Sequence, residues 1–355
     1  MNFTNTNRAP RGITIVEVLA ILVCVAVLVA MGLPAFSRVG CHAMRDVSRA
    51  NLATLSQAHV AYANDWDGRQ YTIVPDTLGV SGGQFGAWET ANGCVPQALL
   101  GTTTLGVHYT AGTECAGGSI ILKQGWLKPL DFSRPSANGA FRLANARLVN
   151  QYVGGRFYDP KFYAPDDPLL NAELRAVMKG GGDFEELSEG LVPSTYTYSP
   201  AAMFDPRVLG FGGSLTNPPY QFPDSNLALG GQGYRSPTVS QCVHPSLKTR
   251  LMEMWAIENP PYPCSPVQQD SCLPCQWNGS FRSRPLTLFF DGSVRIMTPR
   301  EPMFAEDRAN ASLWVRSTPF GAIGVNGQWS GDFIVDTSVH FLTASGIAGR
   351  DTISY

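Results

Sequence analysis

The chain has 355 residues and a net charge of -2, and 15% of its residues are charged, against roughly 25% in a typical soluble domain. A nucleic-acid-binding protein would need a basic face, which this charge balance does not provide, so we expect no nucleic acid partner. The length allows a sizeable buried core in one large domain or two small ones. With 36 Gly and 26 Pro, we expect many turns and loops.

The first twelve residues form a polar segment that carries Arg8 and Arg11 and no acidic residue. An apolar run of 24 residues follows at 13–36, in which Glu17 is the one ionisable side chain apart from the Cys24 thiol. A helix of that length measures about 36 Å, which is enough to cross the hydrocarbon core of a bilayer. Basic residues before such a span keep that end in the cytoplasm. The pattern therefore predicts a leader at 1–12 and a transmembrane or assembly helix at 13–36.

Two simpler interpretations of this N-terminus fit less well. A cleavable secretory signal has an apolar region of about 7 to 15 residues, and this run is longer. A plain membrane anchor would have no use for Glu17, because an acid in a membrane span costs about 2.5 to 3.5 kcal/mol near its centre. Glu17 is therefore predicted to have a function.

Four features occur together here, namely the basic leader, Gly12, Glu17 five residues after it and Pro34 within the apolar run. In these features the chain resembles the type IV pilin and type II secretion pseudopilin family. The resemblance implies cleavage after Gly12 by a prepilin peptidase, methylation of the new amine on Ile13, and assembly into a filament. Ile13 stands where Phe is usual in that family.

The resemblance also implies partners and a location. The partners are the prepilin peptidase, other pilin-like subunits in a homo- or heteropolymer, and the inner-membrane assembly machinery. The chain would cross the cytoplasmic membrane once, with its C-terminal part on the extracytoplasmic side. In a filament, the Glu17 carboxylate can pair with the Ile13 amine of a neighbouring subunit, so that each buried charge has a partner. Secretion, adhesion, motility and DNA uptake all remain open.

Residues 37–65 predict an amphipathic continuation of the helix. The apolar positions on its expected inner face are Met44, Val47, Leu52, Leu55, Ala58 and Val60. The polar residues at 64–67, followed by Gly68, predict the end of the helix. A Ca2+ loop at these acids is the less favoured alternative, since the later ligands are missing.

Residues 66–355 are predicted to form an extracytoplasmic globular pilin-like domain. Short apolar stretches at 71–74, 119–122, 195–198 and 251–255 predict strands. The stretches 286–290 and 293–297 flank Asp291 and Gly292, which predicts a hairpin with a type I′ turn. Residues 79–118 and 205–240 are predicted as long surface loops. The expected fold class is α+β, with the long hydrophobic helix packed on an antiparallel sheet.

Later segments at 158–168, 194–200, 244–246 and 288–294 are similar to those of a large bacterial group of prepilin-like proteins with an uncharacterised C-terminal domain. That group has a His ten positions before an Asp-Gly pair. Phe281 occupies this position here, and Ser293 follows the pair where the group often has His.

The eight cysteines are Cys24, Cys41, Cys94, Cys115, Cys242, Cys264, Cys272 and Cys275. Outside the cytoplasm, structural disulfides are the favoured interpretation. Because seven of the eight lie beyond the apolar run, at least one is free or paired between chains. A metal site or a redox motif at 264–275 is the alternative.

No enzyme is predicted. The five histidines, His42, His59, His108, His244 and His340, show no metal-ligand spacing and accompany no nucleophile motif. No cofactor is expected, with Ca2+ at Asp291, Asp307 and Asp332 as an alternative that ordinary turn acids explain better. The predicted function is a pilin-like structural subunit, and the alternative is a membrane-tethered binding or adhesion domain that uses a pilin-type leader.

Overall fold

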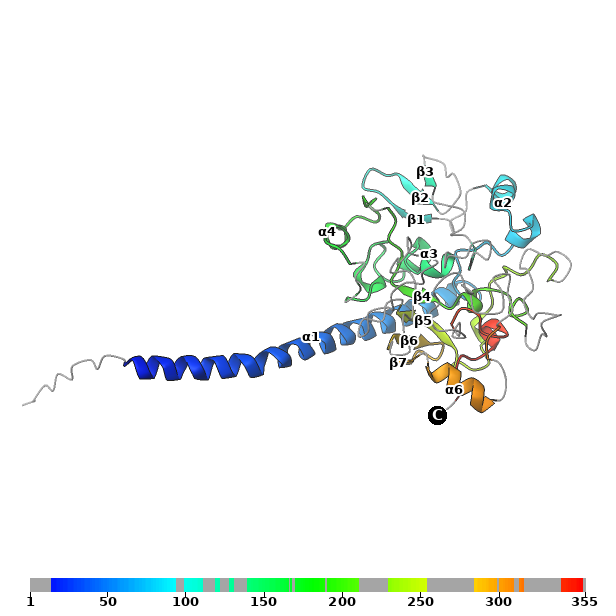
Figure 1. Cartoon of the computed structure of the whole chain (residues 1–355). Coiled ribbons are helices and arrows are strands. Elements are labelled where there is room, and N and C mark those ends of the chain that lie inside the picture. Colours follow the sequence, from blue (N-terminus) through cyan, green and yellow to red (C-terminus); the bar gives the residue numbers. More distant parts are fainter. Residues whose placement is uncertain are drawn as a thin grey trace, which may run out of the picture. The chain divides into compact units, whose positions relative to one another are not determined.

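The computed structural model describes residues 14–93, 99–110, 119–121, 128–130, 139–165, 167, 170–188, 190–210, 229–253, 284–298, 300–309, 313–315 and 340–353. The chain divides into two compact units, residues 1–46 and residues 47–355, and each is described here by itself. Figure 1 labels the helices and strands. The helices are α1 Ile15–Asp65, α2 Phe85–Asn92, α3 Arg147–Asn150, α4 Ala172–Gly180 and α6 Arg300–Ala309. Short 3-10 helices occur at Leu78–Ser81, Ala140–Arg142, Pro160–Phe162, Pro200–Met203, Val239–Gln241 and Gly346–Ala348.

The structure is α+β, as predicted, but the predicted arrangement of a long apolar N-terminal helix on one antiparallel sheet is wrong. Within the described part of the chain, no helix has both the length and the apolar character needed to cross a membrane. The backbone of α1 is helical from Ile15 to Asp65.

In the globular unit, the end of α1 buries one face. Ser48, Leu52, Leu55, His59 and Tyr62 are each at most 4% exposed, and they recur every three or four positions, as one face of a helix requires. Three residues predicted for this face are instead exposed, namely Met44, Val47 and Val60. The prediction counted apolar residues and missed that Ser48 and His59 occupy the inner face.

The helix ends where the sequence predicts, at Asp65. The N–H of Trp66 donates to the Tyr62 carbonyl at 3.0 Å, and the N–H of Gly68 donates to the Ala63 carbonyl at 2.7 Å. Gly68 has a φ of 74°, in the left-handed region that favours glycine at the end of a helix.

A four-stranded antiparallel sheet packs against this end of α1. Its strands are β4 Tyr196–Tyr198, β5 Thr249–Glu253, β6 Leu286–Phe289 and β7 Val294–Ile296, in that spatial order. Buried hydrogen bonds join the helix to β4, between the Ser48 hydroxyl and the Tyr196 phenol at 2.8 Å and between His59 Nε2 and the Tyr198 phenol at 2.7 Å. The Ser48 hydroxyl donates its proton to the Glu253 carboxylate on β5 and can therefore only accept from Tyr196.

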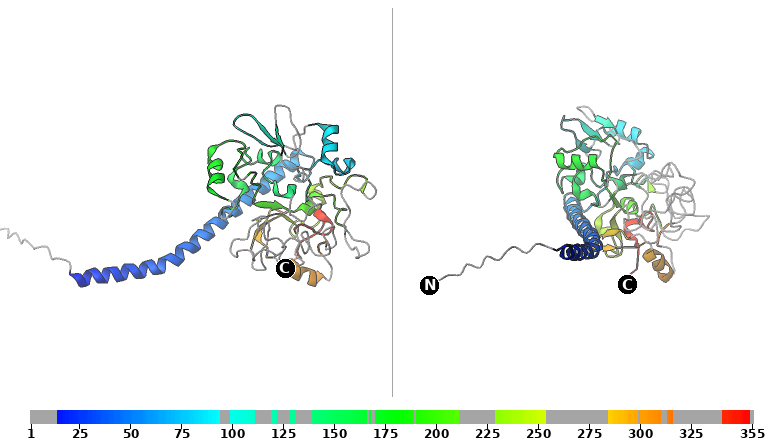
Figure 2. Two further views of the ribbon diagram at one scale, coloured as in Figure 1. Left: turned by 45° about the horizontal axis from the view of Figure 1, so that its top comes forward. Right: turned by 60° about the vertical axis from the view of Figure 1, so that its left-hand side comes forward.

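A second sheet of three strands was not predicted. It consists of β1 Leu99–Thr102, β2 His108–Thr110 and β3 Ser119–Ile121, with β1 and β2 antiparallel and β2 and β3 parallel. β1, β2 and α2 lie within 79–118, which was predicted as a surface loop, whereas β3 coincides with the strand predicted at 119–122. Gly is depleted in strands, yet Leu100 and Tyr109 are buried here, so tertiary packing outweighs the glycine-rich composition. The segment with α3 lies between the two sheets in Figures 1 and 2.

The stretch 71–74 is also not the strand that was predicted. Tyr71 and Ile73 are fully buried, and the Tyr71 phenol donates to the Leu143 carbonyl at 3.0 Å. An aromatic and a β-branched residue are common in strands, but here they fill the buried core without pairing in a sheet.

The predicted hairpin between β6 and β7 is confirmed, but its turn type is wrong. The N–H of Gly292 donates to the Phe289 carbonyl at 3.0 Å, and Gly292 has a φ of 84°. Asp291 does not have a positive φ, so this is a type I turn followed by a left-handed glycine, and not a type I′ turn. The Asp291 carboxylate accepts from the Ser293 N–H at 2.9 Å, which fixes the turn.

Replacing Gly292 with Ala is expected to lower the free energy of unfolding by about 1 to 2 kcal/mol, because a Cβ is disfavoured in the left-handed region. The added Cβ would meet the Ser56 hydroxyl at an ordinary 3.5 Å, so crowding adds little. Urea denaturation measures the change. The control is Gly86→Ala in α2, where nothing lies within 4 Å and φ is not positive, and which should raise stability by up to about 1 kcal/mol. Equal effects of the two variants would contradict this account of the turn.

Candidate functional site

The residues predicted for processing and assembly lie at the N-terminal end. Gly12 and Ile13 lie outside the described residues. Pro34 lies within the helical backbone of α1. Glu17 lies in the first turn of α1 and is exposed. The structure therefore places Glu17 close to the start of the helix, in the unit that precedes the globular body.

Glu17 has a local hydrogen-bonding role that the sequence analysis missed. The N–H and the hydroxyl of Thr14 donate to the Glu17 carboxylate at 2.8 and 2.9 Å, and the N–H of Glu17 donates to the Thr14 hydroxyl at 3.3 Å. This reciprocal pattern is a capping box, in which two side chains satisfy free N–H groups at the start of a helix. The spacing Thr-x-x-Glu before an apolar run was the signal that could have revealed it.

Around Glu17, apolar side chains are exposed on every side of the helix. The exposed residues are Ile15, Val16, Val18, Leu19, Ile21, Leu22, Val23, Val25 and Val27, each 43 to 78% exposed. Exposed Cys24 lies among them. A continuous apolar surface of this kind marks a site that is covered by lipid or by another protein.

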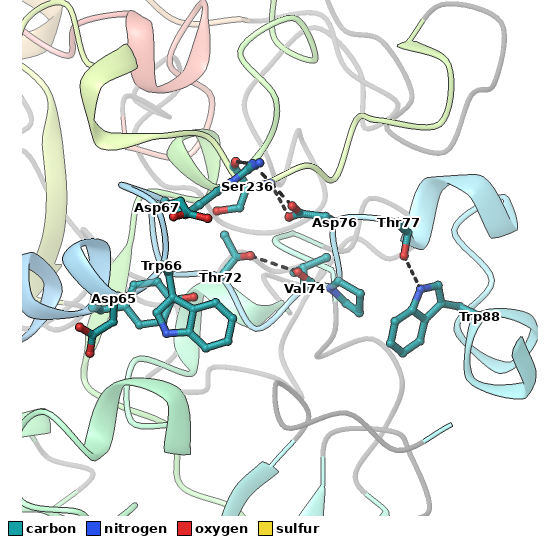
Figure 3. A pocket seen from close by; sticks show the side chains of 12 residues that line it. Asp65, Trp66, Asp67, Thr72, Val74, Asp76, Thr77, Trp88 and Ser236 are labelled. Carbon is teal, nitrogen blue, oxygen red and sulfur yellow. Dashed lines mark hydrogen bonds and ion pairs between the residues drawn. The ribbon is translucent and has the colours of Figure 1, made fainter. Parts of the chain in front are cut away.

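A cavity of about 380 Å³ lies in the globular unit, next to the end of α1. Its lining comes from the last turn of α1, from the chain that follows it, from α2 and from Ser236 (Figure 3). The lining residues are Tyr62, Asp65, Trp66, Asp67, Arg69, Thr72, Val74, Pro75, Asp76, Thr77, Trp88 and Ser236. We call this cavity the helix-end pocket.

One wall of the helix-end pocket is held by a polar network. Arg69 Nη1 lies 3.5 Å from the Asp76 carboxylate and donates to the Ser236 carbonyl at 2.6 Å. The N–H of Ser236 donates to Asp76 at 2.7 Å. The backbone also pairs here, since the N–H of Gln70 donates to the Pro237 carbonyl at 2.7 Å. Arg69 and Asp76 therefore neutralise each other in the wall.

The other wall is aromatic. The rings of Tyr62 and Trp66 stack with centroids 5.5 Å apart and an interplanar angle of 12°. Burial, followed by the charge of Asp76, raises the pKa of Tyr62 above its ordinary value, so its phenol is neutral. Trp88 Nε1 donates to the Thr77 hydroxyl at 2.8 Å, and the Tyr152 phenol donates to Asp65 at 2.7 Å. The pocket thus combines fixed aromatic rings with carboxylates.

A second polar group, which we call the Lys248 cluster, is fully buried and comprises Lys248, Ser199, Thr249, Thr343 and Asp351. The Lys248 ammonium donates to Ser199 and Thr343 at 2.8 Å and to Asp351 at 2.9 Å. Burial lowers the pKa of Lys248, and the charge and hydrogen bond of Asp351 oppose this shift. The three acceptors match the three N–H donors of an ammonium group. With no exposed surface, the cluster cannot receive a substrate.

The histidines have structural positions. His59 lies buried between α1 and β4. His340 is also buried, and its Nε2 donates to the Thr197 carbonyl at 3.0 Å while its Nδ1 lies 2.7 Å from the Thr249 hydroxyl. His108 Nδ1 lies 3.0 Å from the Thr102 hydroxyl. The side chain of His42 lies outside the described part, and His244 is half-buried.

The described residues include two of the eight cysteines and several of the candidate metal ligands. Cys24 and Cys242 are free, and burial raises the pKa of Cys242 to about 11, so it is a protonated thiol. Residues 264–275 and Asp332, and the side chains of Cys41 and Asp307, lie outside the described part. Among the described side chains, no group of three or more His, Cys, Asp or Glu residues could hold a metal ion.

No family model, no curated protein and no solved structure matches this chain.

Proposed function

We propose that the chain is a pilin-like structural subunit, processed by a prepilin peptidase after Gly12 and assembled through its N-terminal helix into a filament of the type II secretion or type IV pilus kind. The observation that carries the proposal is the exposed apolar surface of residues 15–27 with one acid, Glu17, in its first turn. The proposed location is the cytoplasmic membrane, with the globular unit on its extracytoplasmic side.

A helix that is apolar all round is stable in water only when something covers it. Packing against the helices of other copies would cover it and would also bury Glu17. A buried carboxylate is costly without a partner, and the amine created at Ile13 by cleavage supplies a positive charge four residues away in sequence. If the amine of a neighbouring subunit lies next to Glu17, each charge has a partner of opposite sign. The two groups can meet at only one displacement of the subunits along the filament axis.

Variants of Glu17 separate this role from the capping box. Glu17→Gln keeps a side chain that can complete the box but removes the charge. If Glu17 pairs between subunits, Glu17→Gln and Glu17→Leu should both abolish filament assembly, whereas Thr14→Ala should leave assembly intact with a loss of about 1 kcal/mol of helix stability. Electron microscopy of sheared filaments and immunoblotting measure assembly. Normal assembly of Glu17→Gln, together with failure of Thr14→Ala, would show that Glu17 acts as a helix cap and would refute the proposed pairing.

The second candidate function is a tethered binding domain, which the helix-end pocket favours. Exposed Cys24 separates the two candidates. A bifunctional thiol reagent applied to cells should join neighbouring subunits into a covalent dimer through Cys24 if the helices pack in a filament, and Cys24→Ser should abolish that dimer. A monomer band with and without Cys24 would favour the tethered domain.

A further inference from the structure

The helix-end pocket has an unbalanced charge. Its lining contains three aspartates and one basic residue, Arg69. Because Arg69 is paired with Asp76, the charges of Asp65 and Asp67 are not offset by a basic residue of the lining. Both of these carboxylates are exposed and flank Trp66 in the sequence. The pocket therefore presents net negative charge, which disfavours phosphate, sulfate and carboxylate ligands.

The position of these acids at the end of a helix is a separate anomaly. The carbonyl groups at a helix C-terminus carry partial negative charge, and basic residues are preferred there. The last turn of α1 contains no basic residue, and it ends on Asp65 with Asp67 two positions later. Asp67 also has a φ of 51°, which is uncommon for a residue other than glycine. A bound cation would offset the negative charge at this helix end.

The aromatic wall supplies the complementary half of such a site. Trp66 is half-buried and is held in place by stacking on Tyr62, so its ring is rigid. Figure 3 shows this ring on the same side of the pocket as Asp65 and below Thr72. A cation near the face of a Trp is attracted by the ring quadrupole, and Trp is the best of the aromatic side chains in this respect. Val74 and Pro75 add apolar contact for a short alkyl chain.

We propose that the helix-end pocket binds an organic cation, an alkylammonium or guanidinium group with a short apolar chain, with Trp66 against the chain and Asp65 and Asp67 as counter-ions. A neutral ligand of the same shape would desolvate these carboxylates without compensating their charge. The same chemistry is offered by a free amine and by a Lys or Arg side chain of a peptide. The proposal holds whether or not the chain assembles into a filament.

The test is a ligand-observed NMR titration of the full chain with n-butylammonium, N-acetyl-lysine methylamide and the neutral n-butanol. We expect binding of the cations at millimolar concentration and weaker binding at high salt, because screening weakens exposed charge pairs. The double variant Asp65→Asn/Asp67→Asn should weaken cation binding about tenfold, and Trp66→Leu about threefold. Tighter binding of the lysine derivative than of n-butylammonium would identify a peptide as the source.

The matched control is Asp46→Asn, which removes an exposed carboxylate of the same helix that does not line the pocket, and it should leave cation binding unchanged. Circular dichroism on each variant checks that the fold is retained. Equal binding of n-butanol and n-butylammonium would overturn the proposal, as would parent-like binding by the double aspartate variant. The absence of binding by either cation would also overturn it.

Discussion

Replacing Lys248 with Met is expected to lower the free energy of unfolding by about 3 to 5 kcal/mol, the cost of leaving one member of a buried ion pair without its partner. Lys248 and Asp351 are both 0% exposed, and the ammonium hydrogen bonds to Asp351, Ser199 and Thr343. Met fills a similar volume without the charge, so the loss reports on the isolated Asp351 carboxylate. Urea denaturation at neutral pH measures it.

Two comparisons make this prediction specific. The pair Arg207 and Asp205 has nearly the same length, 2.8 Å against 2.9 Å, but Arg207 is 59% exposed. Arg207→Ala should therefore cost less than about 1 kcal/mol. The double variant Lys248→Met/Asp351→Leu should regain part of the stability lost in Lys248→Met, since no charge stays buried. If Lys248→Met lowers the free energy of unfolding as little as Arg207→Ala does, Asp351 does not remain a buried charge in that variant.

The Lys248 cluster also joins distant parts of the chain. Asp351 belongs to the C-terminal segment 340–353, and its carboxylate accepts from the Thr249 N–H on β5 at 2.9 Å. Figures 1 and 2 show this segment, in red, beside the four-stranded sheet. We therefore expect the C-terminal segment to detach from the sheet when the cluster is disrupted, which limited proteolysis would detect.

Acidification below pH 6.5 is expected to destabilise the globular unit through His59. This side chain is fully buried, and burial, followed by the charge of Arg250, lowers its pKa well below the ordinary value of 6.5. Above pH 6.5 both the folded and the unfolded states are neutral. Below pH 6.5 the unfolded chain binds a proton that the folded chain does not, so the free energy of unfolding falls by about 1.4 kcal/mol for each pH unit. At pH 5 the loss is about 2 kcal/mol.

Thermal or urea unfolding between pH 8 and pH 5 measures this slope. His59→Gln should reduce the slope of the free energy of unfolding against pH by about 1.4 kcal/mol per pH unit. This holds even if the variant is less stable than the parent at pH 8. Tyr198→Phe is the control, because it removes the hydrogen bond to His59 Nε2 but leaves the imidazole in place, so the slope should persist while stability falls by about 1 kcal/mol. Identical slopes in the parent and in His59→Gln would rule out His59 as the source.

Local signals predicted several elements of the fold correctly. The helix end at Asp65 followed from polar residues before Gly68, and the hairpin of β6 and β7 followed from Asp291 and Gly292. In each case the deciding interaction lies within a few residues. The turn type was wrong because the Asp-Gly pair fits two turn geometries, and the length of the loop between the strands decides which one forms.

Long-range packing decided what the sequence could not. The buried face of α1 includes Ser48 and His59 because phenols on β4 provide hydrogen-bond partners, and those phenols come from residues about 140 positions away. The second sheet formed in a stretch with turn-rich composition. The helix-end pocket combines Trp66, Trp88 and Ser236, which no local pattern links.

The sequence by itself determined the charge balance, the leader-like N-terminus and the acid at Glu17, because these depend on residue types and their spacing. It also contained the Thr14 and Glu17 capping box, which is a local interaction. The tertiary structure alone decided which side chains are buried and how the strands pair. It also decided where aromatic rings meet carboxylates at the end of α1. The physical reason is that hydrophobic burial and buried hydrogen bonds depend on partners that folding brings together, and their sequence separation leaves no periodic signal.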